Sequence, residues 1–258
     1  MKFTFASLFA LTATAVSASP ILEARASKPK GIDVSNYQGS VDFSTAKSHG
    51  VEFAFIKATE GTSTSSLSPT DEYTGSMLTN LRDPTAYVDP SFSSDWESAN
   101  KAGIIRGAYH FAHPAGSSGA AQAEYFIAHG GGWSKDGRTL PGALDIEYNP
   151  SGSECYGMTH GQIVAFVKDF SDTYHKKTSV YPIIYTTTDW WKTCTGNSAE
   201  FGNTNPLWIA DWSSSIGELP AGWKYATFWQ YADKGSLGPG DQDEFNGTYD
   251  GLKKIASG

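Results

Sequence analysis

The chain has 258 residues, a formal net charge of −8 and 39% hydrophobic residues. An acidic protein has no electrostatic reason to bind nucleic acid or an anionic membrane, so we expect neither as a partner. Aromatic residues make up 14% of the chain and include eight Trp. Aromatic faces stack on sugar rings, which favours a carbohydrate ligand, although burial in the core is an equal alternative for any one of these rings.

Residues 1–19 have the pattern of a secretory signal peptide: a basic residue near the N-terminus, a short apolar run, and small residues before the cleavage point. The apolar run is too short for a membrane anchor. Residues 20–26 are expected to form a short pro-segment, and residues 27–258 a single domain. The sequence therefore predicts a secreted, extracellular protein.

Strands and helices alternate along the rest of the chain. Short apolar runs rich in β-branched and aromatic residues predict strands over 30–34, 53–58, 104–111, 142–147, 180–186, 207–210 and 227–231. Helical patterns fall over 43–49, 92–102, 119–129 and 160–176, the last with Thr159 as a natural N-cap. Residues 61–89 are rich in Ser, Thr, Pro and Asp and are expected to form a long surface excursion.

This alternation predicts the α/β class and a parallel sheet. The number of strands in a chain of this length predicts a single irregular (β/α) barrel of the TIM type, irregular because the last segments lack long helices. In such barrels the active site lies at the C-terminal ends of the strands.

Carboxylates follow three of the expected strands or segments. Asp33 lies near the end of the first strand in GIDVS, Asp145 and Glu147 end the fourth in LDIE, and the C-terminal segment GDQDEFN carries Asp241 and Asp243. Alternate strand residues point to the same side, so Asp145 and Glu147 should project together, with backbones roughly 6.5–7 Å apart. Each raises the pKa of the other, as cleavage of a glycosidic bond by a carboxylate pair requires. That reaction needs no metal and no cofactor, and we expect neither.

Two of the His residues and the two Cys residues raise the alternatives of a metal site and a catalytic thiol. His110 and His113 lie three apart with no third ligand fixed by the pattern, which is a weak metal signal. We expect His110 to be a polar group in the cleft and His113 a loop residue. An even pair of Cys in an oxidising compartment predicts one disulfide, Cys155–Cys194, rather than a metal site or a catalytic thiol.

Six motifs in order resemble glycoside hydrolase family 25, the Chalaropsis-type lysozymes, and secreted fungal members above all. They are GIDVSNYQG, FAFIKATEG, GAYHFAHP, ALDIEYN, LWIADW, and FWQYAD followed by GDQDEFNG. The resemblance covers residues 31–246. It implies an irregular barrel and an N-acetylmuramidase that hydrolyses the β-1,4 bond from N-acetylmuramic acid to N-acetylglucosamine in bacterial peptidoglycan.

The resemblance also implies roles for individual residues. Glu147 would be the acid, Asp145 its negative partner and Asp33 a further carboxylate. The fourth would be Asp241, with Asp243 as the alternative. The family cleft would be lined by Tyr109, Phe111, Tyr185, Trp208, Trp229 and Gln230. The D-x-E on one strand favours a substrate-assisted mechanism, in which the 2-acetamido oxygen of the sugar attacks the anomeric carbon.

Two other functions remain open at this point. A chitin-directed hydrolase would use the same chemistry, because chitin also carries the 2-acetamido group, and a carbohydrate-binding protein would keep the cleft without catalysis. A monomer is expected. The chain has one N-glycosylation motif, at Asn246, and its closeness to Asp241 in the sequence argues against its being occupied.

Overall fold

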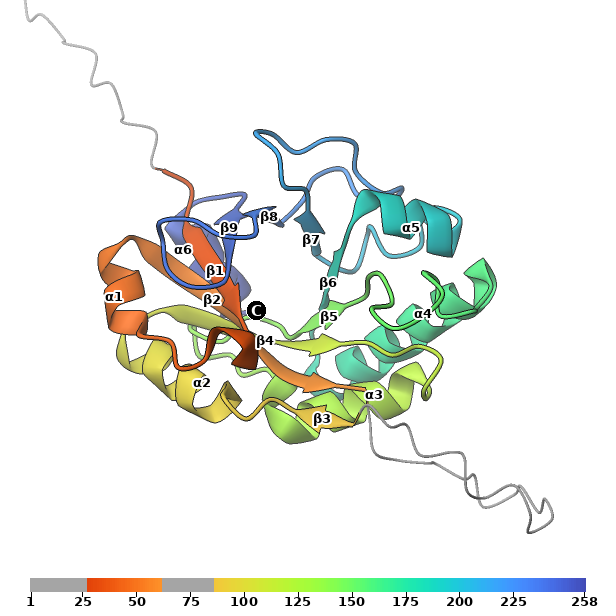
Figure 1. The fold of residues 1–258 in the computed structure, drawn as a ribbon, viewed down its shortest axis with the longest axis horizontal. Coiled ribbons are helices and arrows are strands. Elements are labelled where there is room, and N and C mark those ends of the chain that lie inside the picture. The colour runs from red at the N-terminus through yellow and green to blue at the C-terminus, as the bar shows by residue number, and fades with distance from the viewer. Residues whose placement is uncertain (1–26, 62–85) are drawn as a thin grey trace, which may run out of the picture.

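The computed structural model describes residues 27–61 and 86–258, which form a closed barrel of strands with helices around it (Figure 1). Neighbouring strands follow the order β1-β9-β8-β7-β6-β5-β4-β2, and β2 pairs with β1 to close the barrel. The barrel strands are β1 (Lys30–Val34), β2 (Val51–Glu60), β4 (Ile105–Phe111), β5 (Ala143–Asp145), β6 (Ile183–Thr186), β7 (Leu207–Ala210), β8 (Phe228–Ala232) and β9 (Asp241–Phe245). The predicted α/β barrel is confirmed.

The last barrel strand, β9, runs antiparallel to both of its neighbours, β8 and β1, whereas the other neighbouring pairs in the barrel are parallel. This strand was not predicted, and its reversal is the main departure from a regular (β/α) barrel. Asp33 pairs in register with Asp241. The reversal therefore brings the first residue of β9 to the end of the barrel where the parallel strands finish.

Helices cover the outside of the barrel (Figure 1). They are α1 (Phe43–Ser48), α2 (Phe92–Lys101), α3 (Gly119–Phe126), α4 (His160–Thr178), α5 (Thr188–Thr195) and α6 (Tyr249–Ile255). Thr159 caps α4 as predicted, in a capping box with Gln162. The predicted helix over 119–129 ends earlier, because the chain passes into a π-type turn in which Gly130 has a φ of 106°. The short helices α5 and α6 were not predicted.

The inside of the barrel is filled by aromatic rings. Phe55 stacks on Trp208 with ring centroids 4.3 Å apart, and Phe228 lies edge-on to Phe55 at 5.1 Å. Two glycines, on the strands at either side of β2, make room for its rings: a Cβ at Gly31 would lie 2.4 Å from the Phe53 ring and one at Gly107 would lie 2.7 Å from the Phe55 ring. This packed layer forms the floor beneath the polar end of the barrel.

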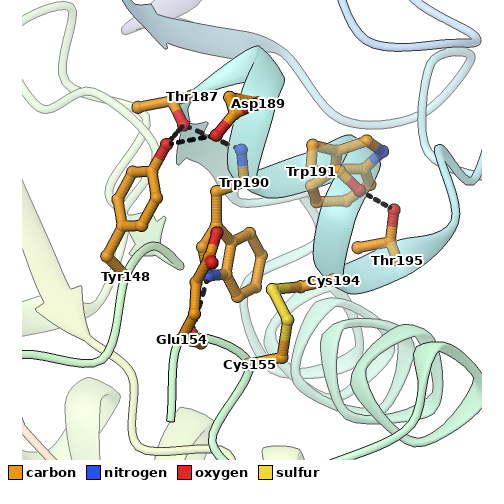
Figure 2. The surroundings of a disulfide bond; sticks show 9 residues. All are labelled: Tyr148, Glu154, Cys155, Thr187, Asp189, Trp190, Trp191, Cys194 and Thr195. Atoms are coloured by element: carbon orange, nitrogen blue, oxygen red, sulfur yellow. Dashed lines mark hydrogen bonds between the residues drawn. A yellow bond between two sulfur atoms is a disulfide. The ribbon is translucent and has the colours of Figure 1, made fainter. Parts of the chain in front are cut away.

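A second apolar layer lies between the strands and the helices, and the disulfide adjoins it. Cys155 is bonded to Cys194, as predicted, which ties the segment after β5 to α5 (Figure 2). Trp190 packs next to the disulfide, fully buried, and donates from its indole nitrogen to the Glu154 carbonyl at 3.1 Å. The bond therefore anchors the wall of the barrel beside the end of β5.

Two further expectations concern the chain outside the barrel. Of the surface excursion expected over 61–89, residues 62–85 lie outside the described residues, and the remainder includes β3 (Tyr87–Val88), which pairs antiparallel with the end of β2. The predicted signal peptide and pro-segment, residues 1–26, also lie outside them. Within 27–61 and 86–258, no helix has the length and apolar character needed to cross a membrane.

Candidate active site

A cavity of about 180 Å³ opens at the C-terminal end of the parallel strands. Every barrel strand contributes to its wall, either from its own residues or from those just beyond its end. The lining residues are Asp33, Ser35, Tyr37, Lys57, Tyr109, Phe111, Asp145, Glu147, Tyr185, Trp208, Gln230 and Asp241. The structure thus brings together, around one small space, carboxylates that are far apart in the sequence.

Trp229, which was expected in the cleft, does not line this cavity. Successive residues of β8 point to opposite faces, so Gln230 faces inward while Trp229 faces outward. The Trp229 indole packs against the outer apolar layer and donates to the Asp211 carbonyl at 2.8 Å. This hydrogen bond joins β8 to the segment that follows β7.

His110 does not lie in the cleft, and that expectation was wrong. Tyr109 and Phe111 face the cavity, so His110 between them points to the outer face of β4, where it is fully buried. Its ring accepts from Thr59 at 2.8 Å and donates to Gln122 at 2.9 Å. Burial lowers the pKa of His110 to about 4, so the ring is a neutral structural group.

The D-x-E pair has the arrangement that the strand period predicts. Asp145 is the last residue of β5 and Glu147 follows two positions later, both lining the cavity, while Ile146 is fully buried in the outer layer. Burial raises the pKa of Glu147 to about 7, and the charge of Asp241 adds to this rise. Burial and the neighbouring Glu147 raise the pKa of Asp145 well above its ordinary value. The Asp145 Oδ1 atom is buried without a hydrogen-bond partner among the described residues.

Gln230 joins two carboxylates on the other side of the cavity. Its Nε2 donates to Asp33 at 2.9 Å and to Asp241 at 3.0 Å. Its Oε1 accepts from the Tyr185 hydroxyl at 3.0 Å and from the Trp212 indole at 2.9 Å. The two carboxyl partners need a donor and the hydroxyl and indole partners donate to an acceptor, so exchanging the amide nitrogen and oxygen would break these hydrogen bonds. The Gln230 side chain therefore has one orientation.

Burial is also the largest influence on the other carboxyls. It raises the pKa of Asp33 to about 8, with a further rise from the charge of Asp241. It raises the pKa of Asp241 to about 6, with a smaller contribution from Asp233. Asp241 lines the cavity whereas Asp243 is fully buried. Of the two candidates in DQDEF, only Asp241 can therefore touch a ligand in this space.

The comparisons with known proteins agree with this geometry. The sequence profile described as Glycosyl hydrolases family 25 matches residues 32–85 and 76–239. The chain belongs to glycosyl hydrolase family 25. It is 48% identical to an N,O-diacetylmuramidase of Chalaropsis sp, over 89% of this chain and 99% of that protein. It is 44% identical to an N,O-diacetylmuramidase of Arthroderma benhamiae over the full length of both. The resemblance seen in the motifs is confirmed, and the protein is a glycoside hydrolase.

A solved structure shows that this family 25 enzyme also resembles its relatives in fold. The family 25 lysozyme from Aspergillus fumigatus is 47% identical and superposes with a TM-score of 0.79, over 90% of this chain and 100% of that one. This chain therefore shares its barrel fold with a solved member of the family.

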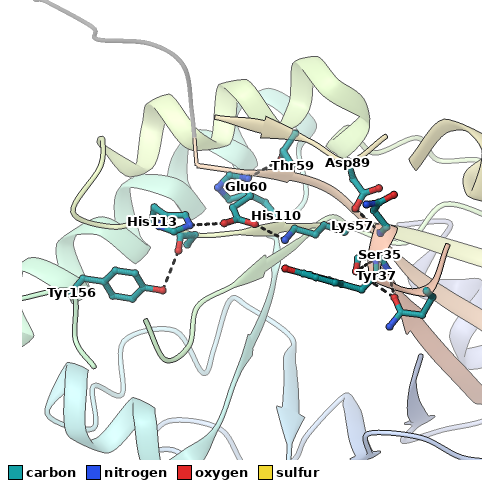
Figure 3. Close-up of polar contacts among 12 residues, drawn as sticks. Ser35, Tyr37, Lys57, Thr59, Glu60, Asp89, His110, His113 and Tyr156 are labelled. Carbon is teal, nitrogen blue, oxygen red and sulfur yellow. Dashed lines mark hydrogen bonds and ion pairs between the residues drawn. The ribbon is translucent and has the colours of Figure 1, made fainter. Parts of the chain in front are cut away.

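A partly buried ion pair lies beside the family 25 cleft, and its lysine, Lys57, lines the cavity. Glu60 accepts from the Lys57 ammonium at 2.5 Å and pairs with the His113 ring at 2.8 Å, so that the two bases approach it from opposite sides (Figure 3). Burial raises the pKa of Glu60, but these two partners outweigh that effect and lower it to about 2. His113, expected as a loop residue, follows β4 and helps to fix Lys57 against the Phe111 ring, 5.1 Å from its centroid.

The sequence did not single out Lys57, Ser35 or two exposed aromatic residues at the cavity. The Tyr37 side chain lines the cavity and is 92% exposed, and Trp212, which is bonded to Gln230, is 60% exposed. Large exposed rings beside a cleft are typical of sugar-binding platforms. Both residues follow the C-terminal end of a barrel strand, in the motifs GIDVSNYQG and LWIADW, and that position was the available signal.

The glycosylation motif lies away from the cleft. Asn246 follows the last residue of β9, whereas Asp241 is its first, so the strand length of about 17 Å separates them. Asn246 is exposed and lies beside a groove of about 720 Å³ that has no residue in common with the catalytic cavity. Asn246 is therefore near Asp241 in the sequence but not near the cleft, so the sequence argument against its glycosylation does not hold.

Proposed function

We propose that this glycoside hydrolase is a lysozyme of the N-acetylmuramidase type, cleaving the β-1,4 bond from N-acetylmuramic acid to N-acetylglucosamine in bacterial peptidoglycan. The observation that carries the proposal is the placing of Asp145 and Glu147 at the end of β5, in a cavity that raises the pKa of Glu147 to about 7. A carboxyl that is still protonated near neutral pH can donate to the leaving oxygen. The names of the Chalaropsis and Arthroderma relatives support the choice of substrate.

In this proposal Glu147 protonates the glycosidic oxygen as the bond to the anomeric carbon breaks. The 2-acetamido oxygen of the same sugar attacks that carbon and forms an oxazolinium-like intermediate. Glu147, now a carboxylate, then takes a proton from the incoming water, which opens the ring and restores the acid. Asp241, whose pKa is raised only to about 6, supplies negative charge on the opposite wall, where Gln230 joins it to Asp33.

Asp145 has a specific part in this sequence. Its Oδ1 atom is buried and has no hydrogen-bond partner among the described residues, a costly state for a carboxylate oxygen. The N–H group of a bound 2-acetamido substituent would satisfy this oxygen, orient the acetamido oxygen toward the anomeric carbon and gain acidity as the oxazolinium charge develops. Such a double displacement retains the β configuration, so NMR of the first product should show the β anomer before mutarotation. An α anomer appearing first would contradict the mechanism and leave the choice of substrate intact.

The decisive experiment measures the loss of turbidity of a bacterial cell-wall suspension. Wild type should clear it, and Glu147→Gln should lose roughly a hundredfold or more of the rate, as expected for loss of a general acid. Glu244→Gln is the matched control, because Glu244 pairs with Lys28 and Lys30 and does not line the cavity. Cleavage of chitin oligomers with no effect on cell walls would move the substrate to chitin. Binding of peptidoglycan without cleavage of either would reject catalysis.

The setting of the enzyme is part of the same proposal. We propose that residues 1–19 are a signal peptide, residues 20–26 a short pro-segment and residues 27–258 the mature, monomeric domain of a secreted enzyme. The disulfide supports this, because such bonds persist in oxidising compartments. Mass spectrometry of the secreted protein gives its first residue, and light scattering gives its oligomeric state.

A further inference from the structure

Asp243 is a buried carboxyl that lies behind the active site and has no part in the proposed reaction. It is the middle residue of β9 and pairs in register with Gly31 of β1 and Gln230 of β8. Its side chain is fully buried and does not line the cavity. Asp33, which does line the cavity, lies within hydrogen-bonding range of it.

The two oxygens of Asp243 have different surroundings. Oδ1 accepts from the Trp208 indole nitrogen at 2.8 Å. Oδ2 is buried and finds no donor among the described residues. A buried carboxylate oxygen without a donor is costly, and that cost disappears when the oxygen carries a proton and donates to a neighbouring acceptor. The Asp33 carboxyl is such an acceptor.

The charges around Asp243 favour the same state. The groups that face it are Asp33 from β1, Asp241 from its own strand, the Trp208 indole from β7 and the Gln230 amide from β8. None of the ion pairs among residues 27–61 and 86–258 includes Asp243, since Lys28 and Lys30 pair with the neighbouring Glu244. Two carboxyls in contact, without a cation, cannot both ionise at ordinary cost.

We propose that Asp243 stays protonated through the catalytic cycle and donates a hydrogen bond to Asp33, which makes it a positioning residue for that carboxyl group. Asp33 is then held by two donors, Asp243 from behind and the Gln230 amide from the side. Burial and the charge of Asp33 raise the pKa of Asp243 well above its ordinary value, which agrees with this arrangement. The proposal rests on the active site described under the proposed function, and no bond is made or broken at Asp243.

The variant Asp243→Asn distinguishes a protonated, neutral Asp243 from one that acts as an anion. An amide keeps an oxygen to accept from Trp208 and an N–H to donate to Asp33, and like a protonated carboxyl it is neutral. Asp243→Asn should therefore keep kcat/KM within about threefold of wild type, with the same pH profile. Asp243→Leu removes the donor and should lower kcat/KM by about tenfold or more, while raising the apparent pKa of Asp33.

The matched control lies two residues away on the same strand. Asp241→Asn changes a carboxyl that lines the cavity, so it should lose far more activity than Asp243→Asn. Equal losses in these two variants, or the loss of one ionisation from the pH profile of Asp243→Asn, would overturn the proposal, because either result means that Asp243 acts as an anion.

Infrared spectroscopy gives a readout that does not depend on activity or on the folding of the leucine variant. At pH 7, the spectrum of wild type minus Asp243→Asn should contain the carbonyl band of a protonated carboxylic acid. A carboxylate band in its place would overturn the proposal. Failure of wild type to clear cell walls would instead count against the proposed function, and the infrared result would still decide whether Asp243 carries the proton.

Discussion

Gln230 donates a hydrogen bond to Asp33 at 2.9 Å, although the two residues lie 197 positions apart in the sequence. Asp33 lies near the end of β1 and Gln230 lies on β8, so the bond exists only because the barrel closes through β9. The same amide holds Asp241 at 3.0 Å. One neutral side chain thus keeps two carboxyls side by side without a cation between them.

Replacing Gln230 with leucine should therefore disturb both carboxyls. The hydrogen bond from Gln230 lowers the pKa of Asp33, so its loss should raise that pKa and shift the pH profile of kcat/KM upward. We expect kcat/KM at pH 6 to fall by about tenfold or more, the scale of one hydrogen bond to a charged group. Trp229→Phe is the control, because Trp229 lies on the opposite face of the same strand. An unchanged pH profile in Gln230→Leu would contradict the role given to the amide.

Glu147→Gln should make the protein more stable as well as inactive, and the gain should depend on pH. The pKa of Glu147 is raised from 4.5 to about 7 by folding. The carboxyl therefore contributes stability that is fully present below pH 4.5 and is lost as the pH rises through about 7. The melting temperature of Glu147→Gln should exceed that of wild type at pH 8, and the difference should shrink at pH 5.

The melting temperature of Glu244→Gln should change with pH in the opposite direction to that of Glu147→Gln. Burial raises the pKa of Glu244, but the hydrogen bonds from Lys28 and Lys30 lower it overall. Its contribution to stability is present above pH 4.5 and is lost as the pH falls below it. This variant should therefore melt at or below the wild-type temperature at pH 8. A pH-independent effect of Glu147→Gln would show that the carboxyl is not perturbed by folding.

Trp212 should contribute to binding in two separable ways. Its ring is exposed at the rim of the cavity, and its indole nitrogen donates to Gln230 at 2.9 Å. Trp212→Ala should raise KM by about three- to tenfold through loss of an aromatic stacking surface. Trp212→Phe keeps an aromatic ring but removes the indole donor. Its KM should therefore be close to that of wild type, and the loss of the hydrogen bond to Gln230 should lower kcat instead. Equal KM values for wild type and Trp212→Ala on cell-wall fragments would exclude a sugar platform here.

Removal of the disulfide should affect stability much more than catalysis. Cys155 and Cys194 are 39 residues apart, and neither lines the cavity. Replacing both with serine should lower the free energy of unfolding by about 3–4 kcal/mol in the chain-entropy model. Urea titration measures this loss, and cell-wall clearing at 25 °C measures the activity that remains. An inactive but fully folded double variant would show that the segment after β5 needs the bond to place Glu147.

The strand period was sufficient to predict the D-x-E pair, because the alternation of β5 continues past its last residue, Asp145, so that Glu147 faces the same cavity and the apolar Ile146 faces away. The same alternation places the side chains of His110 and Trp229 away from the cavity. His110 follows Tyr109 and Trp229 precedes Gln230, and both of these neighbours face the cavity. Consecutive residues of a strand point to opposite faces, so a motif on one strand cannot supply cleft residues at adjacent positions.

The remaining features depend on tertiary structure and were not available from the sequence. The segment DQDEF is too polar to be recognised as a strand, and β9 forms because it closes the barrel between β1 and β8. Without that strand, Asp241 and Asp243 could not be told apart. The links from Gln230 to Asp33 and Asp241 likewise follow from barrel closure and not from any local pattern.

The antiparallel direction of β9 has a practical consequence at Asn246. The strand starts at the cavity and ends at the opposite face of the barrel, so it delivers an exposed side chain to the surface farthest from the substrate. A single cysteine placed at Asn246 would have no free thiol to compete with it among the described residues, since Cys155 and Cys194 are bonded to each other. The enzyme can then be coupled to a bead or an electrode through this one point, with its open end turned outward.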